Sequence, residues 1–188
     1  MKKNLFKSLV DFPVSDEDKR YLNQSIKLEK YKKDESVFRQ GEICPKVYFI
    51  GTGLVKLSYL TLEGKEYIKS FISENEMFGS LQSQLSGGGS SFSAIAMEEL
   101  ELEVLDFSIM KELIERYPAL QKLLLGFFQQ LALKKEIREY EFLCLSAQQR
   151  YENFCLNYPE MSARIKQSEL ALYLGITPIA LSRLKHRK

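Results

Sequence analysis

The side chains best suited to chemistry in this sequence are the basic and hydrogen-bonding groups near its C-terminal end. Residues 162–188 contain six basic residues and one acid, Glu169, which gives this stretch a net charge of +5 and leaves −3 for the rest of the chain. A basic end on a slightly acidic body is typical of a module that binds a polyanion. A solvated basic tail would give the same charges, so charge alone leaves both interpretations open.

Side chains for enzymatic or metal chemistry are scarce. The three cysteines, Cys44, Cys144 and Cys155, are scattered, and the only histidine is His186. This distribution predicts no disulfide framework, no metal site and no His-dependent catalytic site. We therefore expect no catalytic residue and no enzyme activity. A phosphate-handling enzyme built on the Gly-rich residues 86–91 is the least favoured alternative, because a lysine-bearing phosphate loop and a paired base and nucleophile are missing.

The most informative segment is residues 167–184, whose pattern predicts a helix-turn-helix. Ala171 is a small residue where two helices can approach closely, and Gly175 supplies the positive φ that ends the first helix. Thr177 is a favourable N-cap and Pro178 a favourable first residue for the second helix. The residues predicted to form the shared interior are Leu170, Leu174, Ile176, Leu181 and Leu184. An ordinary helical hairpin with exposed charges is the alternative.

One side of the second helix should face outward and can enter a DNA major groove. Arg183 is the candidate for a bidentate contact with guanine, worth ~1–3 kcal/mol of discrimination against a wrong base. Backbone amides at the helix start and polar side chains around it can bind phosphate. The expected DNA-binding residues are Gln167, Ser168, Thr177, Pro178, Ile179, Ser182, Arg183, Lys185, His186 and Arg187.

The chain before this segment begins with a β-rich part. Short alternating or apolar runs predict strands at residues 36–38, 47–50, 54–60, 67–72 and 99–105, with a hairpin tip at Glu63-Gly64. Strands of this length and spacing favour a β-sandwich or β-roll. We expect residues 87–91 to form a flexible surface loop, with an anion-binding loop as the alternative.

After residue 106 the pattern becomes helical. Pro118 suits the first turn of a long helix that reaches about residue 144. One apolar stripe on this helix predicts a dimerisation seam, formed by Leu120, Leu124, Phe127 and Leu131. A second, rotated stripe is expected to face a neighbouring domain: Leu133, Ile137, Tyr140 and Cys144. Both stripes could instead be core in a monomer. Ser146 and Gln149 then predict a capping box that begins a short helix.

These patterns predict an α+β chain in three parts. Residues 1–116 form a β-roll sensory domain with flanking helices, residues 117–144 a dimerisation helix, and residues 145–188 the helix-turn-helix domain. No apolar run approaches the roughly 20 residues of a membrane helix, and the first residues do not form a secretion signal. We therefore expect a cytoplasmic protein without membrane contact.

With this order of elements, the chain resembles the family of the cyclic AMP receptor protein and the fumarate-nitrate reduction regulator, the Crp/Fnr family. The N-terminal resemblance rests on Gly41-Glu42, residues 47–55, residues 63–66 and residues 77–79; the C-terminal resemblance rests on residues 174–178 and 181–184. It implies a homodimer whose cyclic nucleotide-binding-like jelly roll senses a small effector. It also implies that two recognition helices read half-sites on double-stranded DNA one turn apart, ~34 Å, with RNA polymerase as a further candidate partner.

The effector region departs from the family pattern. Ser80 and Phe92 stand where cyclic-nucleotide-binding members carry a glutamate for the ribose and an arginine for the phosphate. Their loss removes charge-assisted contacts that offset desolvation of the phosphate, so we expect cyclic AMP to bind weakly or not at all. Cys44 is the only cysteine before residue 100, so an iron–sulfur cluster is not expected either. An unidentified effector would lie near Phe78, Gly79, Ser80, Leu81, Ser91, Phe92 and Ser93.

The recognition helix departs as well. Pro178 and Ile179 stand where the cyclic AMP receptor protein carries an arginine and a glutamate that read bases, so we expect a different operator. With the sequence ending at Lys188, we expect no β-wing after the helix. The favoured function is a sequence-specific, dimeric transcription regulator. The alternative is a ligand-sensing or protein-interaction module whose vestigial helix-turn-helix does not read DNA.

Overall fold

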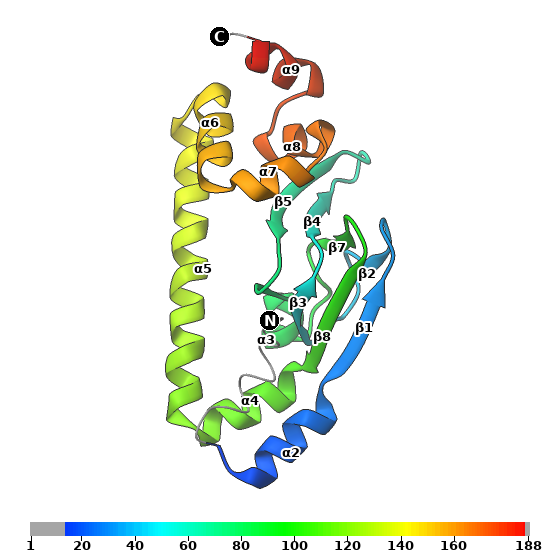
Figure 1. Cartoon of the computed structure of the whole chain (residues 1–188), viewed down its shortest axis with the longest axis vertical. Coiled ribbons are helices and arrows are strands. Elements are labelled where there is room, and N and C mark those ends of the chain that lie inside the picture. Colours follow the sequence, from blue (N-terminus) through cyan, green and yellow to red (C-terminus); the bar gives the residue numbers. More distant parts are fainter. Residues whose placement is uncertain (1–13, 187–188) are drawn as a thin grey trace. The chain divides into compact units, whose positions relative to one another are not determined.

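The computed structural model describes residues 14–186, and the backbone divides into two compact units. The first unit contains the described residues up to Leu124 except Glu66–Ile68. The second contains those three residues and the chain from Leu125 onward. Strands dominate the first half of the chain and helices the second (Figure 1). The chain is therefore α+β, as predicted.

Two four-stranded antiparallel sheets build the β-roll. One has the order β1-β8-β3-β6, with bounds Lys27–Tyr31, Leu100–Asp106, Lys46–Thr52 and Met77–Phe78. The other has the order β2-β7-β4-β5, with bounds Ser36–Phe38, Ser93–Ala96, Val55–Leu60 and Glu66–Ile72. The strands predicted at the five apolar runs correspond to β2, β3, β4, β5 and β8. Gly64, with φ of +78°, lies at the predicted hairpin tip.

The core of the roll follows from the period-2 alternation of its strands. In β8, Leu100, Leu102 and Val104 are buried against inward-facing residues of the other strands. The rest of this cluster is Phe38, Cys44, Tyr48, Ile50, Val55, Leu57, Phe78, Phe92, Ala94 and Ala96. The interior is thus almost entirely apolar and rich in aromatic rings.

Helices cover the opposite face of strands β3 and β8. Phe49 and Leu105 point to this face and pack with Leu22 of α2 (Asp16–Ser25) and with Met110 of α4 (Phe107–Arg116). Leu120, near the start of α5 (Pro118–Cys144), completes the cluster. The short α3 (Leu81–Ser86) follows β6. This helical layer gives the first unit its second core.

The second unit is helical apart from Glu66–Ile68. After α5 come α6 (Ala147–Asn157), α7 (Pro159–Arg164), α8 (Gln167–Leu174) and α9 (Pro178–His186). The predicted capping box is present at the start of α6. The Ser146 hydroxyl accepts from the Gln149 amide at 3.3 Å, and the Ser146 amide donates to the Gln149 side-chain oxygen at 3.0 Å.

The residues of the two stripes predicted on α5 differ in burial. Leu120 is 6% exposed in the core of its own unit, whereas Leu124 is half-buried and lines a pocket of that unit. Phe127 and Leu131 are half-buried. Apart from Phe142, the exposed large apolar side chains of α5 form an outer stripe: Leu125, Leu133, Ile137, Tyr140 and Leu143, with Cys144 beside them.

Candidate nucleic-acid interface

The turn between α8 and α9 forms as the sequence predicts. Gly175 ends α8 with φ of +70°, a conformation that glycine adopts without steric cost. Its amide donates to the Leu172 carbonyl at 3.4 Å, and the Ile176 amide donates to the Ala171 carbonyl at 3.0 Å. These two bonds are a Schellman motif, which stops one helix so that the next can start in a new direction.

The second helix starts with a well-formed cap. The Thr177 hydroxyl accepts from the Ala180 amide at 3.2 Å, and Pro178 is the first helical residue. Thr177 and Pro178 are exposed, so the start of α9 is accessible. Pro178 has no N–H, and the Ala180 and Leu181 amides donate to Thr177, so few amides there are available to an anion.

A compact core holds the two helices. Ala171, Leu174 and Leu181 are at most 1% exposed, and Leu170 is 2% exposed. Ile176 and Leu184 are half-buried, at the edge of the interior predicted for them. Further buried residues come from the preceding helices and loop: Phe154, Met161 and Ile165. The predicted hairpin is therefore supported by α6 and α7 as well.

The predicted DNA-binding residues lie mostly on the surface of this unit. Ile179 is 67% exposed, and Arg183, one turn further along α9, is exposed too. Lys185 is half-buried, with its Nζ 5.7 Å from the centre of the Tyr151 ring. The remaining exposed members are Gln167, Ser168, Thr177, Pro178 and Ser182. His186 ends α9, its side chain is outside the description, and Arg187 lies outside the described residues.

The region predicted for an effector is filled by aromatic rings. The ring centroids of Tyr48 and Phe78 lie 5.0 Å apart, and those of Phe38 and Phe92 lie 5.6 Å apart. The Nζ of Lys69 lies 3.6 Å from the centre of the Phe92 ring. Phe92, 3% exposed, thus occupies the interior with its ring and receives a cation from within the chain.

The other predicted effector residues divide between core and surface. Ser80 is 1% exposed and caps α3, because its hydroxyl accepts from the Ser83 amide at 3.4 Å. Ser93 accepts from the Gln40 amide at 2.9 Å. Leu81 and Ser91 are exposed, and Phe78 is buried. Gly79 has no room for a side chain, since a Cβ would lie 2.8 Å from the Lys46 carbonyl oxygen.

The Gly-rich residues 86–91 differ from the flexible loop expected of them. Ser90 is 2% exposed, its amide donates to the Glu42 carbonyl at 2.8 Å, and its carbonyl accepts from the Gly41 amide at 2.7 Å. A Cβ on Gly89 would lie 2.3 Å from the Gly41 carbonyl oxygen. Gly89 therefore permits close packing against the 41–42 turn, whereas nothing lies within 4 Å of a Cβ built on Gly87.

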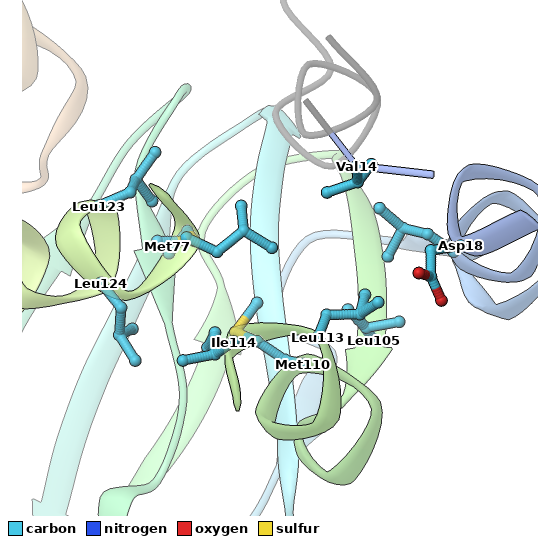
Figure 2. A pocket seen from close by; sticks show the side chains of 11 residues that line it. Val14, Asp18, Met77, Leu105, Met110, Leu113, Ile114, Leu123 and Leu124 are labelled. Carbon is cyan, nitrogen blue, oxygen red and sulfur yellow. The ribbon is translucent and has the colours of Figure 1, made fainter. Parts of the chain in front are cut away.

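The helical layer of the first unit contains an apolar pocket of about 40 Å³ (Figure 2). Its lining includes Leu22, Met77, Met110 and Leu113, and its one charged lining residue is Asp18. This volume can hold only a few water molecules, and the lining offers no set of convergent polar groups. The pocket therefore belongs to the packing of the helical layer.

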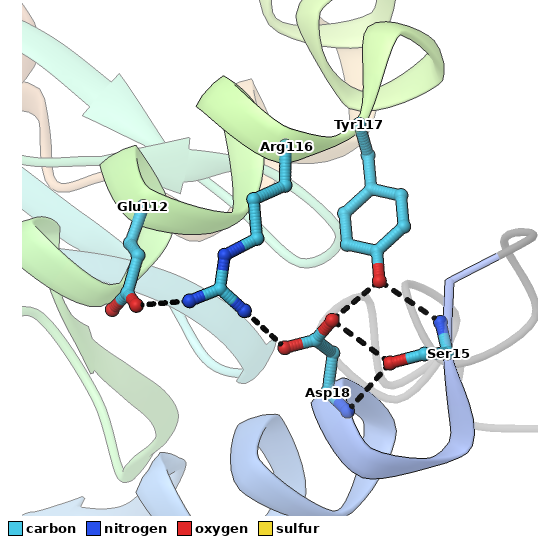
Figure 3. Close-up of polar contacts among 5 residues, drawn as sticks. All are labelled: Ser15, Asp18, Glu112, Arg116 and Tyr117. Carbon is cyan, nitrogen blue, oxygen red and sulfur yellow. Dashed lines mark hydrogen bonds and ion pairs between the residues drawn. The ribbon is translucent and has the colours of Figure 1, made fainter.

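A polar network closes this layer between α2 and α4 (Figure 3). Arg116 lies 2.9 Å from one carboxylate oxygen of Asp18, and Tyr117 and Ser15 donate to the other. The hydrogen bonds from Tyr117 and Ser15, with the Arg116 charge, hold the pKa of Asp18 below its ordinary value. This network ties α2 to the end of α4.

Two arginines of the second unit were missed by the sequence analysis. Arg138 of α5 and Arg150 of α6 both donate to carbonyls at the end of α8. One feature pointed to Arg138: it interrupts an apolar stripe at a position where a seam residue would be expected. Its partner in the turn could not be found by spacing.

Among the described residues there is no group of three or more His, Cys, Asp and Glu side chains arranged to hold a metal ion. None of the helices between residues 14 and 186 combines the length and apolar character required to cross a bilayer.

The chain is similar in sequence to one domain family and to several transcription regulators. Residues 28–117 match the cyclic nucleotide-binding domain. The chain is 27% identical over 164 residues to the cyclic AMP receptor protein of Thermus thermophilus, covering 83% of this chain and 74% of that protein. It is 27% identical over 175 residues to the transcriptional activator protein Anr of Pseudomonas aeruginosa, covering 81% of this chain and 66% of that protein.

The fold is similar to a solved relative. The structure of FixK2 from Bradyrhizobium japonicum aligns with a TM-score of 0.76 at 19% identity, covering 85% of this chain and 82% of that one. In the sequence comparison, the aligned part of the chain corresponds to 74% of the length of the Thermus thermophilus protein and 66% of the length of Anr.

Proposed function

We propose that the chain is a DNA-binding transcription regulator of the Crp/Fnr family that acts in the cytoplasm as a homodimer. Its match to the cyclic nucleotide-binding domain and its similarity to two transcription regulators support this proposal. The observation that carries the proposal is the exposed face of α9. This helix begins with a capped start at Thr177 and places Ile179 and Arg183 on one accessible side. An exposed guanidinium suits base edges and phosphates.

The outer stripe of α5 is the proposed homodimer contact. Its apolar members are 48–78% exposed, a degree of exposure that a second copy could remove by packing its own α5 alongside. This replaces Leu120 and Leu124, which belong to the core of the single chain. A twofold pair presents two recognition helices, as reading two half-sites requires.

The β-roll is proposed to work without cyclic AMP. Ser80 is used as a helix cap, and Phe92 fills the interior under the ammonium of Lys69. A cyclic phosphate at this place would displace packed rings without gaining an arginine partner. Any effector therefore needs chemistry different from that of a cyclic nucleotide.

The test is DNA selection followed by salt-titrated binding. The wild type should enrich one sequence from genomic fragments and lose affinity steeply as salt rises, because phosphate contacts release counterions. Arg183→Ala should weaken binding to the selected site by about 5- to 150-fold, the equivalent of ~1–3 kcal/mol, and weaken random DNA much less. Arg20→Ala, which removes an exposed arginine of α2, is the matched control and should change neither the affinity for the selected site nor the affinity for random DNA.

Equal weakening of selected and random DNA by Arg183→Ala would contradict the base-reading role of Arg183. Failure of the wild type to enrich any sequence would favour the second candidate, a sensory or protein-interaction module with a vestigial helix-turn-helix. The exposure of Arg183 on α9 favours the first candidate.

A further inference from the structure

The carbonyl groups at the end of α8 have an unexpected set of partners. A helix leaves its last four carbonyls without intrahelical donors, which here are those of residues 171–174. The Schellman motif satisfies the first two, at Ala171 and Leu172. The Tyr173 carbonyl accepts from Nη2 of Arg138 at 2.5 Å, and the Leu174 carbonyl accepts from Nη2 of Arg150 at 3.1 Å.

The two guanidinium groups come from different helices and meet on one aromatic ring. The Cζ of Arg138 lies 4.6 Å from the centre of the Phe142 ring, and the Cζ of Arg150 lies 5.0 Å from it. Arg138 also stacks on Tyr173 at 3.6 Å, while Arg150 donates to the Leu145 carbonyl at 2.7 Å. Arg150 therefore joins the end of α5 to the end of α8.

The turn into α9 is packed against the same ring. A Cβ on Gly175 would lie 2.9 Å from Cε1 of Phe142, closer than side chains normally approach. The turn thus has no freedom to tilt toward α5. Guanidinium, ring and turn form one contact set at the corner where α5 meets α6.

This arrangement is electrostatically expensive. Nη1 of Arg138 and Nε of Arg150 are buried without a hydrogen-bond partner. Burial lowers the pKa of Arg138, and the nearby Arg150 charge acts in the same direction, opposed by Tyr173 and Glu141. Apolar residues could fill such a corner at less cost, whereas charged groups with directional bonds specify a single arrangement of the elements around them.

We propose that Arg138 and Arg150 are positioning residues for DNA recognition, which clamp α8, and through the Gly175 turn the recognition helix, onto the corner between α5 and α6. The proposal rests on the proposed function in one respect: a fixed angle between α5 and α9 matters because two recognition helices of a dimer must meet half-sites at a set separation. The clamp itself lies within one chain and can be measured without DNA.

The experiment measures the distribution of distances between two spin labels in the full-length protein by pulsed electron paramagnetic resonance. Cys144→Ser and Cys155→Ser first remove two native thiols, and the labels are then attached at Gln129→Cys on α5 and Ser182→Cys on α9, which are both exposed positions. An excess of unlabelled protein ensures that the measured distances lie within one chain. The unaltered clamp should give one narrow distribution. Arg138→Gln with Arg150→Gln should broaden it while helix content remains, and Lys122→Gln, an exposed charge on α5, should leave it narrow.

A second pair of variants guards against misfolding. Arg138→Lys and Arg150→Lys retain the charge but not the planar fork, so each should also broaden the distribution if directional bonds to the two carbonyls set the angle. An unchanged distribution in all of these variants overturns the clamp.

The functional arm uses the operator selected by the wild type. With 2 base pairs inserted between half-sites, the wild type should lose about tenfold in affinity and the doubly substituted protein about twofold or less, while both bind a single half-site equally. A broadened distribution with an unchanged spacing preference overturns the positioning role. If the wild type selects no DNA at all, the proposed function fails, and the distance measurement still decides whether the clamp exists.

Discussion

At the scale of single residues, Ile179 and Arg183 are four positions apart on the same exposed side of α9. Arginine can donate two hydrogen bonds to a guanine edge, whereas isoleucine can only make apolar contact, for which the 5-methyl group of thymine is the one apolar feature in the major groove. A half-site read by this helix should therefore contain a thymine near a guanine.

This expectation can be tested by removing a single methyl group. Replacing that thymine with uracil in the selected site should weaken wild-type binding by about fourfold, since burying one such group is worth ~0.8 kcal/mol. Ile179→Ala should bind the thymine and uracil sites equally. A uracil penalty that persists in Ile179→Ala would show that another residue reads the methyl group. Quantitative gel-shift titration at one salt concentration gives all four affinities.

Asp18 supplies a pH-dependent contribution to stability. Because hydrogen bonds from Tyr117 and Ser15 and the Arg116 charge lower its pKa in the folded state, its stabilisation is present above the ordinary value of 3.8 and is lost as pH falls through the lowered pKa. Asp18→Asn should thus lower Tm at pH 6, and the difference from wild type should shrink toward pH 3. Asp16→Asn, an exposed neighbour, is the control in thermal unfolding. A difference that stays constant with pH would contradict the role of the ionised carboxylate.

At the scale of elements, α5 uses its two apolar stripes for different purposes. Its first turns complete the helical core of the β-roll unit through Leu120, while the outer stripe remains exposed. If the outer stripe is the homodimer contact, as proposed, assembly and folding use separate side chains of one helix.

Two substitutions should separate these purposes. Ile137→Glu places a charge in the outer stripe and should shift the protein toward monomers in sedimentation experiments. Leu120→Ala should cost about 2–5 kcal/mol in the free energy of unfolding, because it opens a cavity in the core, and should leave self-association of the folded protein intact. A dimer that survives Ile137→Glu, or monomers produced by Leu120→Ala, would place the contact elsewhere.

The same elements show what local sequence can and cannot predict. Strands β3, β4 and β8 were predicted because one face of each is continuously apolar, whereas β1 was missed because its Leu28 is 72% exposed and its other residues are mostly charged. The turn into α9 was predicted because Gly175, Thr177 and Pro178 determine it locally. The sequence did not predict which stripe of α5 is buried, nor did it predict the contacts of Arg138 and Arg150, because both depend on partners distant in sequence.

At the scale of the whole molecule, the chain combines an apolar β-roll with a basic end that is proposed to bind DNA. A ligand that binds only the folded protein raises its stability with concentration. If the roll has no site for cyclic AMP, as proposed, the nucleotide should not raise its stability.

Cyclic AMP at about 1 mM should leave both Tm and operator affinity unchanged, because a dissociation constant well above that concentration gives negligible stabilisation. The cyclic AMP receptor protein from Thermus thermophilus, treated identically, is the comparison. A clear rise in Tm, or a tighter operator complex, would mean that the rings around Phe92 move aside for the nucleotide.

If the exposed outer stripe of α5 is the homodimer contact, as proposed, the assembly state of the protein depends on its abundance. Association follows mass action, so newly made chains pair only once their number passes a level set by the dissociation constant of the pair. Below that level each monomer leaves its apolar stripe exposed to water and can bind only one half-site of a palindromic operator. Expression of the regulated genes would then show a threshold in the concentration of this protein, with no small-molecule effector required.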